Sequence, residues 1–353
     1  MRKPFIQKSL VNNRLFAYCS SICFVLVSLL LGISIGTVHV PITSVLKIIG
    51  HELFPFIQME QVDPMFRNIV MNVRLPRVIL ASLVGAALAI AGAAFQGLLR
   101  NPLADPYTLG VSSGASVGAV VTLFFQLSIP WVESFTLPLL SIVSSFLTIL
   151  LVLSFAQRIE KSMKVETIIL TGIIFSSFLG AFISLMIALT GDELRQIIGW
   201  LLGSVSMRGW AYIQIILPFL IIGSCILLFN AKELNAMSFG EDRAHHLGVD
   251  VQRRKLLILT AGSILTGAAV AVSGTIGFVG LVIPHLTRLL WGPDHKHLLP
   301  LSIMTGSGFL ILADLLARTI ISPTELPIGV ITALIGAPVF GFILMRRRTE
   351  GSG

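Results

Sequence analysis

The sequence predicts an all-α membrane protein that crosses the lipid bilayer about ten times. Of its 353 residues, 55% are hydrophobic and only 12% are charged, and the mean hydropathy is +0.91. A soluble domain has about 25% charged residues, so this chain has too few polar side chains for a soluble surface and too many apolar ones for a disordered chain. A crossing helix needs about 20 residues, so ten crossings use about 200 and leave no room for a large extramembrane domain.

Ten apolar stretches are predicted to span the membrane, and residues 1–353 form a single transmembrane domain. The first stretch follows a basic N-terminus, but it is longer than the apolar region of a signal peptide and lacks an A-x-A-like cleavage site. Residues 194–206 are apolar but short and predict a half-helix at one face. The ten spans lie near residues 15–36, 78–99, 109–127, 136–156, 167–189, 210–229, 256–273, 276–291, 298–318 and 326–345.

The stretch 276–291 is interrupted by Gly277, Gly280 and Pro284. A continuous hairpin through residues 256–291 and a broken helix both fit this pattern. Irregular backbone is tolerated at membrane depth only where it is buried in protein or lines a cavity.

The lysines and arginines divide unevenly between the two sides of these spans. With the N-terminus placed inside, 18 of the 25 fall in inner segments and seven in outer segments, whereas the 17 acidic residues divide almost evenly. An excess of basic residues is typical of the cytoplasmic side, so both termini are predicted to be cytoplasmic. The net charge of +8 reflects this orientation and does not indicate a nucleic-acid partner.

An internal repeat links the two halves of the chain. The run Gly85-Ala-Ala-Leu-Ala-Ile-Ala-Gly92 recurs as Gly267-Ala-Ala-Val-Ala-Val-Ser-Gly274, five crossings later. An odd number of crossings inverts the second copy, and inverted repeats are a recurring architecture of transporters. The alternative is that helices rich in glycine and alanine resemble one another by chance.

No catalytic or metal site is predicted. The run Gly110-Val-Ser-Ser-Gly114 matches the nucleophile elbow of hydrolases, but membrane helices flank it, and the spacing of Gly110, Gly114 and Gly118 favours close helix packing. His245 and His246 lack a metal-binding partner one helical turn away, and the three cysteines lie in apolar stretches.

The sequence favours an energy source outside the spans for any transport. No phosphate-binding loop of the form G-x-x-x-x-G-K-[ST] occurs, so ATP chemistry would need another polypeptide. Ion-coupled carriers usually place ionisable groups at mid-membrane, and the predicted spans of this chain contain few ionisable residues. An ion-coupled carrier that uses Asp314 and His285 stays an alternative. A scaffold or receptor without transport activity is a second alternative.

The largest inner loop, residues 230–255, predicts two short helices joined by a turn. Apolar residues recur with helical spacing at Leu234, Met237, Ala244 and Leu247, and Gly240 and Gly248 interrupt the pattern. Such a pair either packs back on its own protein or docks in the groove of a partner. The pattern alone does not decide between these uses.

Six motifs occur in order along residues 15–346. In the first half they are Arg74-Leu-Pro-Arg77, the glycine run 85–92 with its continuation through Asn101-Pro102, and 109–115 around Gly114. In the second half they are Gly240-Glu241…Ala244…Leu247-Gly248, then Gly274-Thr-Ile-Gly277-Phe-Val-Gly280-Leu-Val-Ile-Pro284-His285, and finally 313–340 with Asp314 and Arg318. Together these resemble the permease subunits of ABC importers for iron chelates, such as siderophores and haem, and for cobalamin.

The resemblance implies a multi-pass permease of the bacterial cytoplasmic membrane that imports its substrate by alternating access. It implies a second permease subunit, identical or homologous, two cytoplasmic ATPases that carry ATP and Mg, and an extracytoplasmic binding protein. The chain itself would hold no cofactor and would not be an enzyme. A ferric siderophore is the expected substrate, with cobalamin or haem as the alternative.

The resemblance also implies a role for three groups of residues. The coupling loop would meet the ATPase through Leu234, Gly240, Glu241, Ala244, Leu247 and Gly248. Arg74, Arg77 and Arg318 would be exposed and would pair with acidic groups of the binding protein. The pathway and its gates would be bordered by Asn101, Pro102, Gly114, Gly277, Gly280 and Pro284.

Overall fold

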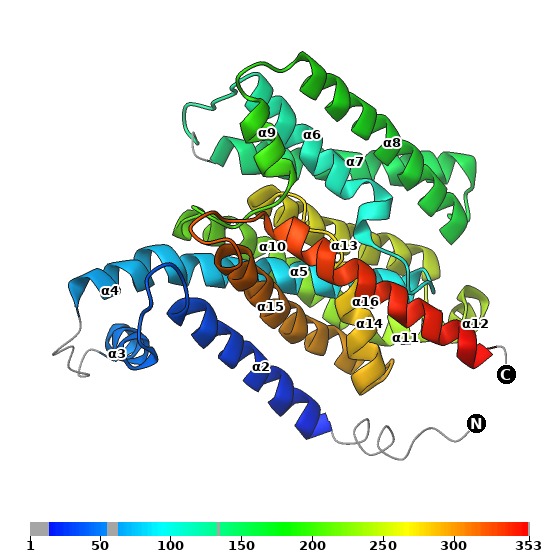
Figure 1. The fold of residues 1–353 in the computed structure, drawn as a ribbon. Coiled ribbons are helices and arrows are strands. Elements are labelled where there is room, and N and C mark those ends of the chain that lie inside the picture. The colour runs from blue at the N-terminus through cyan, green and yellow to red at the C-terminus, as the bar shows by residue number, and fades with distance from the viewer. Residues whose placement is uncertain (1–13, 55–62, 133–134, 352–353) are drawn as a thin grey trace.

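The computed structural model describes residues 14–54, 63–132 and 135–351, and every regular element in these ranges is helical (Figure 1). Arg2, Lys3 and Lys8 of the basic N-terminus and Ser352 and Gly353 at the C-terminus lie outside the described residues. The elements are α2 (Arg14–Ser34), α3 (Ile42–Leu53), α4 (Pro64–Asn68), η1 (Ile69–Arg74), α5 (Leu75–Leu98), η2 (Pro106–Leu109), α6 (Val111–Phe124), α7 (Thr136–Ile159), α8 (Val165–Leu189), α9 (Leu194–Leu201), α10 (Trp210–Phe229), α11 (Ala231–Ser238), α12 (Glu241–His246), α13 (Val251–Ser273), α14 (Val279–Trp291), α15 (His295–Thr319) and α16 (Ile328–Gly351).

The predicted spans correspond to helices of the structure. Seven helices in the described ranges are long and apolar enough to cross a membrane, and three shorter apolar helices fall at the predicted spans 109–127, 276–291 and 326–345. The second span is longer than predicted, because helix begins at Pro64, where Asp63 caps it by accepting a hydrogen bond from the Met65 amide (2.8 Å), and runs on through η1 into α5.

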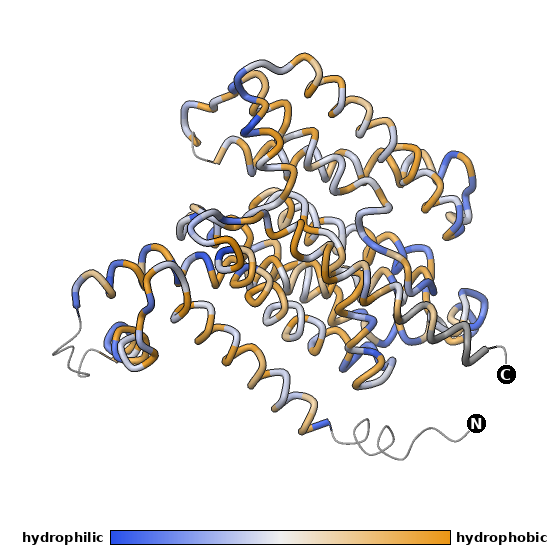
Figure 2. Tube along the Cα trace, in the orientation of Figure 1, coloured by the Kyte–Doolittle hydropathy of each residue, from blue (hydrophilic) through white to orange (hydrophobic). Residues whose placement is uncertain are grey.

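The helices are arranged around α5 and α13, the two helices that carry the internal repeat (Figure 1). Both are buried over most of their length, whereas α8 and α10 are largely exposed on their apolar sides. Figure 2 shows hydrophilic residues mainly at two opposite ends of the bundle, with hydrophobic helices between them. This distribution suits a protein whose middle lies in lipid and whose ends lie in water.

The two copies of the repeat run in opposite directions. Arg77, in the first turn of α5, donates a hydrogen bond to Ser206, and nearby Ser204 donates its backbone N–H to the carbonyl of Ser273, the last residue of α13. The start of α5 therefore lies at the same end of the molecule as the end of α13, as an inverted repeat predicts. Helix α2 begins, and α16 ends, toward the other end (Figure 1).

Glycines of the repeat allow neighbouring backbones to approach closely. A β-carbon on Gly92 would lie 1.9 Å from the carbonyl oxygen of Gly280 in α14, and one on Gly85 would lie 2.2 Å from that of Gly306 in α15. In the second copy, a β-carbon on Gly274 would lie 2.1 Å from the carbonyl oxygen of Trp200. Small residues therefore set how closely α5 and α13 pack against their neighbours.

Replacing Gly92 by alanine is expected to destabilise the fold by about 1–3 kcal/mol, because the added methyl group would press against the backbone of α14. The free energy of unfolding in a detergent titration measures this loss. Gly180→Ala in α8 is the matched control, since a β-carbon there meets no atom within 4 Å and alanine favours helix. Equal stability of the two variants would contradict the packing role of Gly92.

The region after α13 is a broken helix and not a continuous hairpin. Helix α13 ends at Ser273, and α14 begins only after Phe278, whose φ of +68° is unusual for a bulky residue. The hydroxyl of Tyr107 donates to the carbonyl oxygen of Ile276 (2.7 Å) and accepts from its N–H (2.9 Å), which satisfies the irregular backbone. The predicted half-helix is also present, as α9, although it ends at Leu201 and not near 206.

Candidate functional site

The predicted coupling loop forms two short helices, α11 and α12, joined at Gly240, as the spacing of its apolar residues indicated. Leu234 and Ala244 are fully buried and pack the pair against the bundle. On the other side, Phe239 and Leu247 leave 67% and 71% of their surface exposed, and Gly240 and Gly248 adopt positive φ. The pair thus packs back on its own protein and also presents apolar side chains outward. Its docking to an ATPase stays a prediction.

An ion pair with a buried lysine fastens α12 to the bundle. The Glu241 carboxylate lies 2.7 Å from the ammonium group of Lys255 in α13, and Lys255 is only 1% exposed. The same ammonium group donates a hydrogen bond to the carbonyl oxygen of Met163, in the turn between α7 and α8 (2.8 Å). Glu241 therefore connects the coupling helices with two other parts of the fold.

Asn235 makes a second connection, which the sequence did not reveal. Its side-chain oxygen lies 2.9 Å from the backbone nitrogen of His295 and 2.8 Å from Nδ1 of the same residue, and its amide donates to the Asp294 carboxylate (2.7 Å). Asp294 in turn accepts from the Lys296 amide and caps α15. One side chain of α11 thus holds the first turn of α15. A polar residue on a short helix gives no signal of such a contact in the sequence.

Replacing Asn235 by alanine is expected to lower the free energy of unfolding by about 2 kcal/mol, because three partly buried hydrogen bonds of about 0.5–1 kcal/mol each are lost. Asn72→Ala is the matched control: the Asn72 amide donates only to exposed Asn68, so its loss should cost less than about 0.5 kcal/mol. Detergent unfolding of both variants tests this. A cost at position 235 no larger than that at position 72 would contradict it.

The prediction that Arg74, Arg77 and Arg318 are exposed is wrong, because all three side chains are buried. Arg74 donates to the carbonyl oxygens of Ile33 (2.8 Å) and Ser34 (2.7 Å) and to that of Val38. These carbonyls belong to the end of α2 and the segment after it. The guanidinium group therefore serves this chain's own backbone, and its role toward a binding protein stays a prediction.

Arg77 and Arg318 share one buried carboxylate. Asp314, in α15, is fully buried and accepts hydrogen bonds from Nε and Nη2 of Arg77 at 2.9–3.0 Å. Nε of Arg318 lies 3.6 Å from Oδ2 of Asp314, which also accepts from Nε of Arg77. Arg77 also pairs with Glu325 at 2.7 Å, and Glu325 is 39% exposed. The cluster joins the start of α5 to the end of α15, at the end of the molecule opposite the coupling helices.

The predicted pathway residues have different environments. Gly114 lies directly against Thr148 of α7, as the packing interpretation indicated, and Gly280 approaches the backbone of Leu88. Pro284 is buried within α14. A β-carbon on Gly277 would meet no atom within 4 Å, so open space adjoins the broken segment there. Their role in transport stays a prediction.

Asn101 and Pro102 lie in the loop after α5, where the Asn101 side chain accepts from the Leu103 amide (2.9 Å). Gln96, one turn before this loop, was not predicted as a site residue. Its amide donates to the carbonyl oxygens of Gly280 (3.2 Å) and Leu281 (3.0 Å), and its oxygen accepts from Arg288 (3.1 Å). Gln96 thus links α5 with the first turn and the last turns of α14. In the sequence, the signal that Gln96 has a structural role was its position as a lone amide side chain in an apolar span.

The model of the FecCD transport family matches residues 24–346. The chain is 62% identical over 351 residues, 99% of each chain, to a Bacillus subtilis protein named "Uncharacterized ABC transporter permease protein YvrB". It is 43% identical over 282 residues to "Cobalamin import system permease protein BtuC" of Halobacterium salinarum, covering 80% of this chain and 74% of that one.

A solved structure described as a metal-chelate type ABC transporter in an inward-facing conformation superposes with a TM-score of 0.80. Its sequence is 33% identical, and the match covers 93% of this chain and 98% of that one. More distant relatives, 36–40% identical, are named as permeases for hemin, molybdate and ferric dicitrate.

Proposed function

The chain belongs to the FecCD transport family, and from this premise we propose that it is the transmembrane permease of an ATP-driven importer that moves a ferric siderophore across the bacterial cytoplasmic membrane. The observation that carries the proposal is the helix pair α11–α12. Leu234, Ala244 and Glu241 fasten it to the bundle, while Phe239 and Leu247 face outward. A firmly held helix pair with exposed apolar side chains suits the groove of a partner.

The partner at this face is a pair of ATPase subunits that bind ATP and Mg, because the chain lacks a phosphate-binding loop of its own. A second permease subunit completes the pathway, because a chelate is far larger than a single ion. The excess of basic residues in the segments around α11–α12 supports a cytoplasmic position for this face. Both termini then lie in the cytoplasm.

A substrate-binding protein docks at the opposite face, where the segments around Arg74, Arg77 and Arg318 meet. Because these arginines are buried, reversing their charge would disturb the fold and obscure any effect on docking. Exposed Arg67, which pairs with Glu52 at 2.6 Å, gives a cleaner test. The affinity of the loaded binding protein for the Arg67→Glu variant, measured at low salt, is expected to fall if this face receives an acidic partner.

Uptake of a radiolabelled ferric siderophore by cells that express the chain with its ATPase and binding protein tests the substrate. Accumulation is expected to require the chain. Cobalamin is the second candidate, since a relative named for its import is 43% identical, against 36% for one named for ferric dicitrate. Haem is the third. Accumulation of cobalamin or haem without any ferric siderophore would refute the siderophore proposal and leave the permease role intact.

A further inference from the structure

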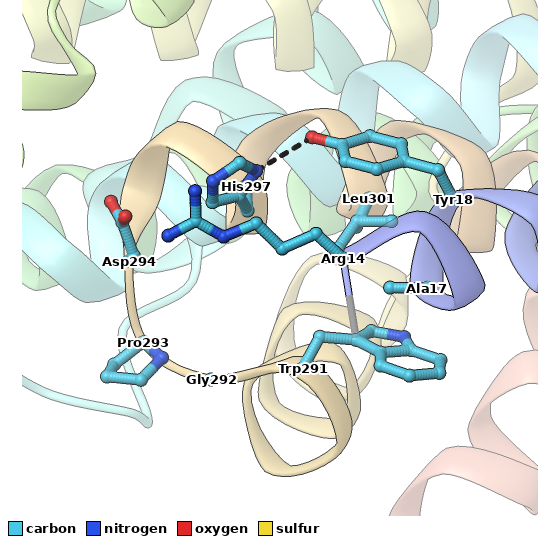
Figure 3. A pocket seen from close by; sticks show the side chains of 9 residues that line it. All are labelled: Arg14, Ala17, Tyr18, Trp291, Gly292, Pro293, Asp294, His297 and Leu301. Carbon is cyan, nitrogen blue, oxygen red and sulfur yellow. Dashed lines mark hydrogen bonds between the residues drawn. The ribbon is translucent and has the colours of Figure 1, made fainter. Parts of the chain in front are cut away.

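A small pocket lies between the start of α2 and the turn that joins α14 to α15, at the end of the molecule that carries the coupling helices (Figures 1 and 3). Its volume is about 210 Å³, and its lining includes Arg14, Tyr18, Trp291, Asp294, His297 and Leu301. None of these residues belongs to the coupling loop, the arginine cluster or the broken helix.

The pocket has one cationic and one anionic group. Among the described residues, neither Arg14 nor Asp294 forms an ion pair with another side chain, so each charge is available to a ligand. Although burial raises the pKa of the Asp294 carboxyl, hydrogen bonds from Asn235 and from the Lys296 amide lower it below its ordinary value. Asp294 is therefore an anion at neutral pH.

The remaining lining is aromatic and apolar. The Tyr18 hydroxyl is hydrogen-bonded to Nδ1 of His297 (3.1 Å), which holds both rings at one wall of the pocket (Figure 3). Trp291 stacks edge-on against Phe16, with ring centroids 6.0 Å apart. Tryptophan and tyrosine gather at the level of lipid headgroups, where one end of the ring is apolar and the other wet.

The pocket also adjoins a surface suited to acyl chains. Helix α2 exposes apolar side chains from its first turn onward, with Leu15 74% exposed and Phe16 and Ile22 nearly half exposed. Ala17 and Leu301 continue this surface into the pocket itself. A ligand with a polar head and an apolar tail would therefore place its head between Arg14 and Asp294 and its tail along α2.

We propose that this pocket binds the headgroup of phosphatidylethanolamine, with the lipid phosphate on Arg14 and the ammonium group on Asp294. An arginine fork matches phosphate oxygens, and a carboxylate accepts hydrogen bonds from a primary ammonium group. A choline headgroup has no N–H to donate, and a glycerol headgroup has no positive charge. The site therefore prefers phosphatidylethanolamine to phosphatidylcholine and to phosphatidylglycerol. That the lipid comes from the cytoplasmic leaflet rests on the orientation proposed above.

Quenching of Trp291 fluorescence by lipids brominated on the acyl chain tests the proposal. The full chain and its Trp291→Phe variant are reconstituted into phosphatidylcholine vesicles that contain a minor share of one brominated lipid, and the difference between them gives the Trp291 signal. Brominated phosphatidylethanolamine is expected to quench the Trp291 fluorescence as if it were about fivefold enriched at the pocket relative to brominated phosphatidylcholine. A fivefold ratio corresponds to about 1 kcal/mol, which is the free energy of an exposed ion pair.

Two variants assign the charges. Asp294→Asn, which keeps an oxygen to cap α15, should remove the preference over phosphatidylcholine and over phosphatidylglycerol. Arg14→Gln removes the partner of the phosphate, which all three lipids carry, so it should weaken the binding of all three without changing their order. Arg158→Gln changes an exposed arginine outside the pocket and should leave the quenching unchanged. Equal quenching by all three lipids would overturn the proposal, as would a preference for phosphatidylethanolamine that persists in the Asp294→Asn variant. Because no step needs ATP or substrate, the result is independent of the transport function.

Discussion

Replacing Asp314 by alanine is expected to lower the free energy of unfolding by about 3–5 kcal/mol, the cost of removing one partner from a buried ion pair. Asp314 is fully buried and accepts hydrogen bonds from two nitrogens of Arg77, with Arg318 on its other side. Alanine would leave both guanidinium groups without this carboxylate in a site that excludes water. Detergent unfolding of the purified variant measures the loss.

Glu325→Gln is the matched control, because it removes a carboxylate from the same Arg77. Glu325 is 39% exposed, so solvent can replace its charge, and the expected cost is about 0–1 kcal/mol. A large difference between the two variants locates the stabilisation in the buried half of the cluster. Equal costs would mean that Asp314 is no more important to the fold than its exposed neighbour.

Asp314 also bears on the alternative of an ion-coupled carrier that uses Asp314 and His285. A relay carboxylate must exchange protons with a pathway, whereas Asp314 is held between two guanidinium groups at one end of the bundle. A carrier of that kind would lose gradient-driven transport in the Asp314→Asn variant while keeping its stability. We expect the opposite, a loss of stability.

The spans could be predicted from the sequence because apolar length is a local property. Residues 165–189 form α8 almost as predicted, since an uninterrupted apolar run of this length has few other conformations available in lipid. Helix α3 was missed because residues 42–53 are too short to span and bury only Val45 and Ile48. The amphipathic pattern of these residues lies in a polar part of the chain, so a loop was as good a prediction as a helix.

The environment of the arginines could not be predicted, because their partners lie far away in the sequence. Arg74 contacts carbonyl groups of residues 33–38, and Arg77 contacts Asp314, more than 200 residues later. Composition places an arginine near the end of a span but does not show whether it faces water or another helix. For the coupling loop, the spacing of the apolar residues predicted the two short helices, but it could not show that Leu234 and Ala244 are buried while Leu247 is exposed.

The Glu241→Arg variant is expected to abolish chelate uptake while leaving membrane insertion intact. Glu241 lies 2.7 Å from the ammonium group of Lys255, which is itself buried and bonded to Met163. Arginine at position 241 would set two cations against each other where the attraction between Glu241 and Lys255 now holds α12. The repulsion is expected to release α12 from α13, so that ATPase closure would move a loose helix and not the bundle.

Two further variants separate a loose coupling helix from a general effect of charge. Glu166→Arg makes the same change of charge on an exposed residue at the same end of the bundle, and uptake should be retained. Glu241→Gln keeps the shape and a hydrogen-bond acceptor toward Lys255, so it should lower uptake less than arginine does. The ATPase activity of the assembled transporter, measured beside uptake, should persist in Glu241→Arg and lose its dependence on the loaded binding protein. Unchanged uptake in Glu241→Arg would show that the contact between α12 and Lys255 does not transmit ATPase motion, because a helix that can be released without loss of transport is not the coupling element.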